Sequence, residues 1–420
     1  MRVAIVGTGV AGLTAAYYLH RDHEIQVFER NDYVGGHSHT VTVREGTRSV
    51  GLDTGFIVYN ERTYPNFTRL LRELDVATQP SEMSFSVQCR ACKIEYCSRS
   101  LRGLFARPDQ LVRPRFHRML LEIMRFNRLG SAWLQHPRHD EPTLGAFLRR
   151  RRFSRQFVRH YATPMASAIW SSTSADAEHI PLLFFLRFFE NHGLLSVHDH
   201  PAWRTVSGGS RRYVHALTRG FADRIHLNTA VRRIRRGPAG ATLELADGAA
   251  ATFDKVVVAT HSNQALRLLA DPSDLEERAL AALRYQSNEA VLHTDARLLP
   301  RRHRAWASWN YHMDDCRRVE SALPMTYYLN RLQGLESTTH YCVTLNDRGR
   351  IAPDRILRRI QYEHPLFTPA SMTAQRQLNE LNGERHTYYC GAYLGCGFHE
   401  DGVNAGLAVV RSLERDRAAA

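Results

Sequence analysis

Lysine is almost absent from this chain of 420 residues, in which Lys93 and Lys255 are the only two. Arginine therefore carries nearly all of the positive charge, and 56 basic against 42 acidic residues leave a formal net charge of +14. A surplus of this sign attracts polyanions and anionic membrane surfaces.

Cysteine is also sparse, and its seven residues are odd in number. This excludes a small secreted scaffold held by disulfides and indicates a reducing compartment.

Long apolar runs are missing too. No uninterrupted stretch reaches the roughly 18 residues that a membrane-spanning helix needs, and the apolar opening breaks too early for a signal peptide. With 43% hydrophobic and 23% charged residues, the composition excludes a disordered or fibrous chain. We therefore expect a cytoplasmic protein of two or three domains, with peripheral contact at the inner face of the membrane as a secondary expectation.

The first forty residues carry a nucleotide-binding pattern. The apolar segment 2–6 predicts a buried parallel strand, a G-x-G-x-x-G turn and a predicted helix follow, and a second predicted strand ends in Glu29. In this pattern Gly7 allows the tight turn, Gly9 lets the backbone approach a pyrophosphate, and Gly12 lets helix and strand pack closely. The N-terminus of the helix offers free N–H groups to the phosphates, and the acid accepts hydrogen bonds from a ribose.

A second glycine-rich segment indicates which dinucleotide is bound. The pair Gly35-Gly36 follows the second predicted strand, and the turn Gly51-Leu52-Asp53-Thr54-Gly55 comes shortly after it. A nicotinamide-binding domain does not need a paired glycine here, whereas the longer FAD needs a further stretch of backbone for its pyrophosphate and ribityl chain. The two segments together predict FAD.

With these segments, the sequence resembles the flavin-containing amine oxidoreductase superfamily, which includes monoamine oxidases, phytoene desaturases and protoporphyrinogen oxidases. The glycine pair and Thr40 match a family motif, with His37 where arginine is usual, and Asp53 and Gly55 match the family's Asp-x-Gly turn. The resemblance recurs at 206–217, 225–234, 253–260 and 388–413. It implies an α/β fold in which a Rossmann-like (GR2-type) FAD-binding domain is interleaved with an α+β substrate domain. The expected FAD domain is 1–75, 206–265 and 381–415, and the expected substrate domain is 76–205 and 266–380.

The resemblance also implies particular contacts. The opening and the segment 390–402 resemble, more narrowly, a bacterial branch of predicted NAD/FAD-binding proteins associated with cyclopropane-fatty-acid synthases. Two features depart from the wider family: Ala392 stands where an acid is usual, and neither lysine matches the one that amine oxidases place near flavin N5. The expected cofactor-binding residues are Gly7, Gly9, Val10, Ala11, Gly12, Glu29, Arg30, Gly35, Gly36, His37, Thr40, Gly55, Val231, Thr260, Gly391, Gly402 and Val403.

The implied reaction is transfer of a hydride from a substrate carbon to flavin N5, with the protein supplying position and electrostatics. We predict an FAD-dependent oxidoreductase for a small apolar substrate, such as a fatty-acyl chain or lipid. Two alternatives stay open: a flavin amine oxidase, and a flavin-binding protein without redox turnover. His399 and Tyr59 are the candidate catalytic residues, as proton-handling groups near the motif edges. No second dinucleotide fingerprint follows, so the electron acceptor stays unassigned.

Apolar and basic runs suggest further partners. Residues 181–189 are very apolar and predict a buried helix that lines the core or a substrate tunnel, with a surface that dips into anionic membrane as the alternative. Arginine runs at 149–152 and 232–236 lack any accompanying nucleic-acid motif. They predict solvated basic faces and no nucleic-acid partner.

The spacing Cys89-x-x-Cys92-x-x-x-x-Cys97 raises the question of zinc. A structural zinc site takes four ligands, whereas three thiols occur here and the nearest downstream histidine is His117. The alternation of residues 84–96 predicts instead a β-hairpin with the first two cysteines at its turn. We therefore predict no metal site.

Overall fold

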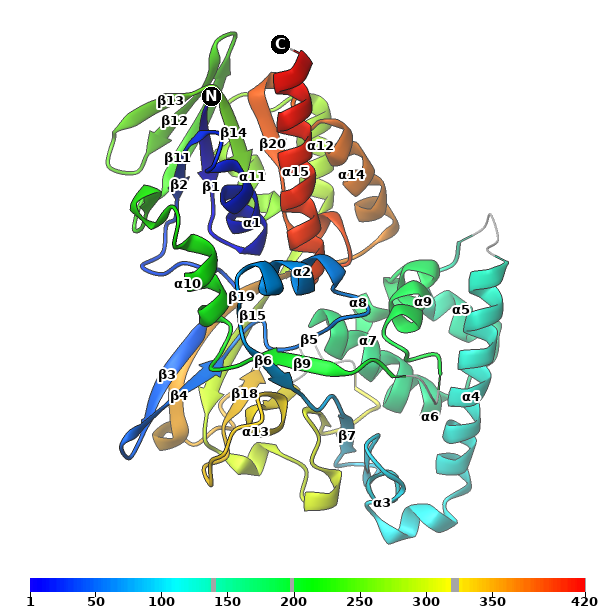
Figure 1. The fold of residues 1–420 in the computed structure, drawn as a ribbon. Coiled ribbons are helices and arrows are strands. Elements are labelled where there is room, and N and C mark those ends of the chain that lie inside the picture. The colour runs from blue at the N-terminus through cyan, green and yellow to red at the C-terminus, as the bar shows by residue number, and fades with distance from the viewer. Residues whose placement is uncertain (137–140, 197–199, 319–324, 420) are drawn as a thin grey trace.

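The computed structural model describes residues 1–136, 141–196, 200–318 and 325–419. Figure 1 shows two regions between which the chain passes several times, with both labelled termini in the upper one. The upper region is built on a parallel sheet, whose strands come from four separate parts of the chain. Its order is β10 (Ile225–His226), β2 (Glu24–Phe28), β1 (Arg2–Val6), β14 (Lys255–Val258) and β20 (Thr387–Tyr389).

The central strand β1 has apolar side chains on both faces, which explains why both faces of this sheet are covered. Val3 and Ile5 lie in one apolar core, whereas Ala4 and Val6 lie in another on the opposite face. Successive side chains of a strand point to opposite faces, so a strand that is apolar throughout needs cover on each side. The first face carries α1 (Val10–Leu19), α2 (Pro65–Glu73), α10 (Arg211–Thr218) and α15 (His399–Ala419).

The second face is covered by an antiparallel sheet and by helices. This sheet contains β11 (Val231–Gly237), β12 (Gly240–Leu245) and β13 (Ala250–Phe253), and the helices are α11 (Ser262–Leu268), α12 (Asp274–Ala282) and α14 (Pro369–Glu380). The last two helices belong to the segment 266–380, which the sequence assigns to the substrate domain. In the structure, both helices nevertheless pack on the parallel sheet of the upper region, which is the expected nucleotide-binding region. Their apolar side chains belong to the same core as the second face of that sheet.

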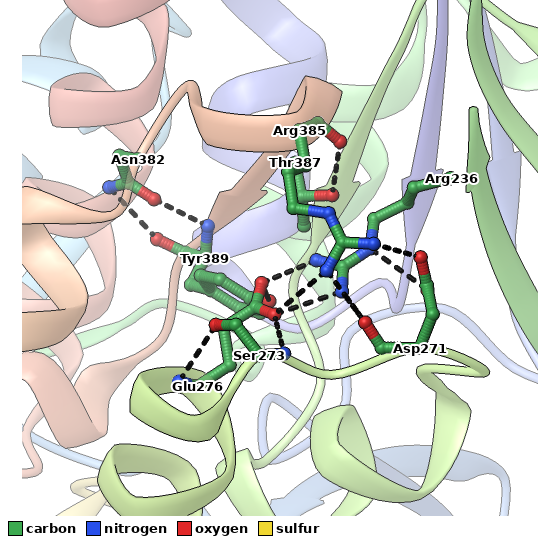
Figure 2. Close-up of polar contacts among 8 residues, drawn as sticks. All are labelled: Arg236, Asp271, Ser273, Glu276, Asn382, Arg385, Thr387 and Tyr389. Carbon is green, nitrogen blue, oxygen red and sulfur yellow. Dashed lines mark hydrogen bonds and ion pairs between the residues drawn. The ribbon is translucent and has the colours of Figure 1, made fainter. Parts of the chain in front are cut away.

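A buried ion pair fastens α12 to this region (Figure 2). Arg236 of β11 binds Glu276 of α12 through two hydrogen bonds, and their side chains are only 1% and 5% exposed. The Tyr389 hydroxyl donates to the same carboxylate at 2.6 Å. Arg236 also contacts Asp271, which pairs with Arg385 near the surface. Burying two charges is tolerable here because each finds several partners.

The lower region is built on a mixed sheet and a helical lobe. The sheet order is β19 (Ile356–Pro365), β15 (Tyr285–His293), β18 (Cys342–Leu345), β17 (Met325–Tyr328), β16 (Trp309–Met313), β7 (Phe85–Cys89) and β8 (Ile94–Cys97). The lobe contains α3 (Leu101–Leu104), α4 (Pro114–Gln135), α5 (Leu144–Arg150), α6 (Arg155–Phe157), α7 (Thr163–Trp170), α8 (Ser174–His179) and α9 (Leu182–Asn191). A short helix, α13 (Leu329–Leu332), follows β17. The hairpin predicted for residues 84–96 is present as β7 and β8.

Small β elements connect the two regions. The ribbon of β3 (Thr40–Glu45) and β4 (Arg48–Asp53) packs its apolar side chains on the core of the lower region, and a three-stranded sheet joins β5 (Tyr59–Asn60), β9 (Trp203–Val206) and β6 (Thr78–Pro80). In the described part of the chain, no helix is both long and apolar enough to cross a bilayer.

The apolar segment 181–189 forms most of α9, and its aromatic side chains lie in the core. Phe184 stacks on Phe367, and Phe188 stacks on Phe398, both with nearly parallel rings. Phe185 and Phe189 are almost completely buried. The segment is therefore a core helix, as the first of its two interpretations proposed, and its apolar side chains are not available to a membrane.

Candidate cofactor and active site

The first glycine turn places a helix N-terminus at an open position. Gly9 caps α1 in an extended conformation, and among the described residues no side chain caps this helix and no acid stands in its first turn. A Cβ atom at Gly9 would meet no atom of the described residues within 4 Å. The first N–H groups of α1, which have no partner within the helix, thus follow a glycine with open space beside it, as at helix N-termini that bind phosphate.

The second glycine loop closes this space from the other side. Gly36 has φ +58°, and a Cβ atom there would lie 3.1 Å from the Cα atom of Gly9. The Gly35 N–H donates to the Thr8 carbonyl oxygen at 3.1 Å. The two glycine segments, which the sequence separates by almost thirty residues, thus form one cradle of backbone, as FAD needs.

Glu29 stands at the end of β2 beside the same turn and is buried. Its carboxylate accepts hydrogen bonds from the Thr8 backbone N–H at 3.0 Å and from the Thr8 hydroxyl at 2.5 Å. It also accepts two hydrogen bonds from Asn31. These bonds hold the acid at the place where a nucleotide ribose meets the first strand–helix unit. The next residue, Arg30, points into solvent.

Asp53 is the centre of a buried polar network, which the sequence had included only as a family motif. It is fully buried and accepts hydrogen bonds from the Thr40 hydroxyl at 2.6 Å, the Ser210 hydroxyl at 2.7 Å and the Ser210 N–H. Its own N–H donates to Gln333 at 3.0 Å. Burial raises the pKa of Asp53 to about 6, against these hydrogen bonds, which lower it. Thr40 therefore supports Asp53 in this structure, although the sequence predicts it as a cofactor contact.

His37 lies in a cluster of rings that sequence analysis did not find. It stacks on Tyr362 of β19 at 4.7 Å and lies 5.8 and 5.6 Å from His261 and His364. Burial, and then the neighbouring His364 and His261, lower the pKa of His37 well below its usual value. Burial also lowers the pKa of His364 to about 4. These two imidazoles are therefore neutral near pH 7 and act as hydrogen-bonding groups rather than cations.

The remaining predicted contacts lie around the same cradle. Gly55 packs on the backbone of His37, Thr260 lies against the Gly7 turn, and Val231 begins β11. Gly402 approaches α1 closely, because a Cβ there would lie 2.5 Å from the Val10 side chain. Val403 is buried in the core beside it. The closing helix α15 begins at His399, so Gly402 and Val403 lie near its beginning.

Ala392, which stands where the family usually has an acid, lies between the end of β20 and the start of α15. Gly391 follows β20 with its backbone against the Tyr393 ring. Asp401 accepts a hydrogen bond from the Phe398 N–H at 2.9 Å, so its carboxylate turns back to the start of the helix. Glu400 accepts from the N–H groups of Asn66 and Phe67 and thereby caps α2.

The two candidate catalytic residues are buried. The His399 ring stacks on Phe56 at 3.7 Å, and its Nε2 atom lies 2.7 Å from the Tyr213 hydroxyl, which in turn contacts Ser38. Burial lowers the pKa of His399 to about 3. Tyr59 is 2% exposed and packs edge-on against Phe67. The role of these two residues in proton handling stays a prediction, and their surroundings favour a positioning role.

The lower region contains two cavities. The first is lined by hydroxyl and amide groups together with aromatic and aliphatic residues, and it includes Asn288. The Asn288 amide lies 3.0 Å from the Nδ1 atom of His364, which ties this cavity to the cluster. The second has a more carbon-rich wall, made by Trp170, Ile180, Pro365, Leu366, Phe367 and Pro369, beside the polar groups of Asp176, His179 and Arg284.

The cradle and the interleaved sheets define a dinucleotide-binding flavoprotein with a separate substrate region. The family model of flavin containing amine oxidoreductases matches residues 10–318, and the chain belongs to this family. The resemblance seen in the sequence is thereby confirmed, as are the α/β fold class and a flavin cofactor, typically FAD. The open space at Gly9, the uncapped helix and the buried Glu29 fit that cofactor.

Individual relatives agree with this assignment. The "Putative flavin-containing monoamine oxidase AofH" of Mycobacterium tuberculosis is 29% identical over 260 residues, which are 59% of this chain and 54% of that protein. The chain thus spans about half the length of the curated relatives it matches. A redesigned putrescine oxidase superposes with a TM-score of 0.72 at 14% identity, covering 99% of both chains. A fatty acid isomerase from P. acnes that produces CLA superposes at 0.66 and 14% identity, covering 99% of this chain and 98% of its own.

Proposed function

We propose that the chain is an FAD-dependent oxidoreductase that removes a hydride from an apolar substrate, such as a fatty-acyl chain or lipid. The observation that carries the redox part is the double-glycine cradle at an uncapped helix N-terminus. When bound there, the flavin accepts a hydride at N5. The chain holds the dinucleotide through backbone N–H groups and Glu29, and the second cavity, whose wall includes Pro365 next to His364, is the candidate substrate site.

The carbon-rich second cavity supports the apolar substrate. Its wall is continuous with the aromatic core of the lobe through Trp170 and Phe367, whose rings both contact Phe184. Apolar walls of this kind bury most of a ligand, and a few polar groups fix its orientation. Phe367 lies three residues beyond His364, so a ligand in this cavity would reach toward the histidine cluster.

Contact with anionic membrane is the delivery route that we propose for such a substrate. Leu111 and Val112 are 56% and 80% exposed, and Leu101, Leu121 and Met124 on α3 and α4 are also exposed. Exposed arginines stand among them at positions 102, 115, 118 and 128. Figure 1 shows α3 and the adjoining end of α4 at the lower corner of the molecule. Apolar side chains that dip into lipid beside cations that meet its phosphates are typical of interfacial binding.

A flavin amine oxidase is the second candidate. It is favoured by the relative AofH and by Asp176, whose carboxylate lies at the second cavity and could receive an ammonium group. The near absence of lysine counts against the amine oxidase arrangement that the family resemblance implies.

Anaerobic bleaching of the flavin separates these candidates. The holoprotein is mixed without oxygen with fatty acids in vesicles and, separately, with putrescine and aromatic amines. Bleaching by the lipid supports the first proposal and bleaching by an amine supports the second, whereas photoreduction without any bleaching substrate identifies a flavin-binding protein. Phe367→Ala should slow bleaching by the lipid, and the distant Phe221→Leu, in the core of the nucleotide-binding region, is the control.

Vesicle sedimentation tests the membrane contact separately. Leu111→Ser with Val112→Ser should weaken binding to vesicles that contain anionic lipid by about tenfold. Moving two aliphatic side chains from water into lipid contributes on the order of 1.5 kcal/mol or more. Leu357→Ser changes an exposed leucine on β19 and is the matched control. Equal sedimentation of both variants would exclude this surface.

A further inference from the structure

Four metal-binding side chains meet where the β7–β8 hairpin, the helical lobe and the loop after β16 come together. The Sγ atoms of Cys89, Cys92 and Cys316 and a ring nitrogen of His160 all lie within 4.8 Å of one another. We propose that these four residues bind one zinc ion as a closed structural site. The sequence pattern had counted only the three local thiols and His117, and neither Cys97 nor His117 belongs to this cluster.

The sheet register explains why Cys316 reaches the hairpin turn. Strands β7 and β16 run parallel, with Cys89 opposite Met313 at their ends. Beyond these strand ends, the hairpin turn runs alongside the loop after β16. The N–H groups of Arg90 and Ala91 donate to the carbonyl oxygens of residues 313 and 314, each at 2.9 Å. Cys316 comes three residues after this strand end, at the same edge of the sheet. A thiol 224 residues away along the chain from Cys92 is thereby brought to it.

His160 is oriented as a metal ligand. It lies in a π-helical turn, Val158–Ala162, and such turns often mark functional positions. Its Nδ1 atom lies 3.2 Å from the Gln156 carbonyl oxygen, and its Nε2 atom lies 3.1 Å from the Cys92 sulfur. A carbonyl partner at Nδ1 fixes the proton there and leaves the Nε2 lone pair for a metal. The Tyr96 hydroxyl donates to the His160 carbonyl oxygen at 2.7 Å and holds the turn against β8.

The cluster has the size and composition that zinc requires. In a tetrahedral site with bonds of about 2.3 Å to sulfur and about 2.0 Å to nitrogen, neighbouring ligand atoms are about 3.5 to 3.8 Å apart. The four ligand atoms lie within 4.8 Å of one another, and the His160–Cys92 pair is 3.1 Å apart, so small side-chain rotations would complete the site. Three thiolates and one imidazole are a structural donor set, and four protein ligands leave no position for a substrate.

Burial and charge also fit a bound ion. Cys89 and His160 are 1% and 2% exposed, while Cys92 and Cys316 are partly exposed and give the ion a route inward. Zinc with three thiolates carries one net negative charge, and Arg159 and Arg317 both interact electrostatically with the cysteines of the cluster.

The ion would fasten one wall of the substrate region. The π-helical turn continues directly into α7, whose Ser167 and Ala168 line the first cavity and whose Trp170 lines the second. Zinc would therefore cross-link the hairpin, this wall and the loop after β16. Its role is structural, so its presence does not depend on which substrate the enzyme takes.

Metal analysis of the flavin-containing protein, purified in a reducing buffer without chelator, tests the proposal. We expect about one zinc per chain in the wild type and below about 0.1 in Cys316→Ser and His160→Gln, since a structural site that loses one of four ligands binds zinc far more weakly. Cys97→Ser is the matched control, because this buried thiol lies on the same hairpin but faces the Trp306 carbonyl oxygen. Flavin content reports whether each variant folds, independently of zinc.

X-ray absorption at the zinc edge decides the ligand set in the wild type, even if a variant fails to fold. Three sulfur atoms and one nitrogen would confirm the site. The proposal is overturned if the folded protein holds no zinc after reduction and incubation with Zn²⁺, if the zinc has mainly oxygen ligands, or if non-reducing mass spectrometry finds these cysteines as disulfides. Hydrogen exchange in residues 158–172 should quicken when a chelator removes the ion, whereas exchange in the distant strand β1 should not.

Discussion

Replacing Gly9 by valine tests the cofactor cradle at its most exposed point. A Cβ atom at Gly9 meets nothing within 4 Å in the described part of the chain, and Gly9 has φ −64° and ψ 171°, which valine adopts readily. The folded protein should therefore accept the side chain. The bound nucleotide should not, because the pyrophosphate must approach this backbone closely.

The size of the effect follows from the bonds at stake. Hydrogen bonds to a charged group contribute about 1.5–3 kcal/mol each. Displacing the phosphates from two N–H groups at the start of α1 would then cost about 3–6 kcal/mol, or roughly 10²- to 10⁴-fold in FAD affinity.

The assay is flavin content after purification, followed by titration of FAD into the colourless variant and a thermal melt of the apoprotein. Gly237→Ala is the matched control, because a Cβ at Gly237 also meets nothing within 4 Å among the described residues, and it lies on a β-hairpin away from the cradle. Stoichiometric flavin of wild-type affinity in the Gly9→Val protein would refute the placement of the pyrophosphate. A variant that loses both its flavin and its cooperative melt would show that valine disturbs the fold itself.

Three further expectations follow from the same structure. Glu29→Gln should weaken FAD binding by about tenfold, measured by titration, because a hydrogen bond from a ribose to a charged acceptor is stronger than one to an amide. Glu276→Gln should lower the free energy of unfolding by about 3–5 kcal/mol in urea melts, because Arg236 would stay buried without its counter-charge. Burial raises the pKa of Glu276, but the Arg236 and Tyr389 hydrogen bonds outweigh it and bring it to about 2. This stabilisation should therefore be complete above the ordinary glutamate pKa of 4.5 and fade as pH falls toward 2, with the wild-type and variant melts converging. FAD affinity should stay flat from about pH 7 to 8, because burial lowers the pKa of both His37 and His364 and keeps the two imidazoles neutral there; a rise in affinity on acidification across this range would mean that one of them becomes a cation beside the phosphates.

The nucleotide-binding half of the molecule could be predicted because its signals are local. The Gly7–Gly12 turn, the strand before it and Glu29 lie within thirty residues, and each has a conformational requirement that few other residues meet. The confirmed strands β1 and β14 are buried on both faces and read as continuous apolar runs. The start of α15 is fixed by a contact that the sequence does not record, since the Asp401 carboxylate accepts a hydrogen bond from the Phe398 N–H just before the helix.

The substrate side could not be predicted in the same way. His37 meets Tyr362 and His364 only because β19 pairs with β15 and passes the second glycine loop, and no spacing in the sequence records that meeting. The same holds for the thiol cluster, whose histidine and fourth ligand come from a π-helical turn and from a loop more than two hundred residues beyond the hairpin. Counting the possible ligands in one short stretch of sequence therefore misses a site whose residues are brought together by the pairing of distant strands.

A neutral imidazole stands at position 37, where an arginine is usual in the family, so glycines rather than this charge carry the sequence signal. The family's usual arginine is His37 here, and burial keeps that imidazole and its neighbour His364 neutral. The Glu29 carboxylate, which accepts a hydrogen bond from the Thr8 N–H of this turn, repels phosphate. The attraction for a pyrophosphate must then come from the free N–H groups and the dipole of α1, which act only at close range. Such a site binds through shape and contact, so a side chain at Gly9 should harm it more than the loss of any surface arginine.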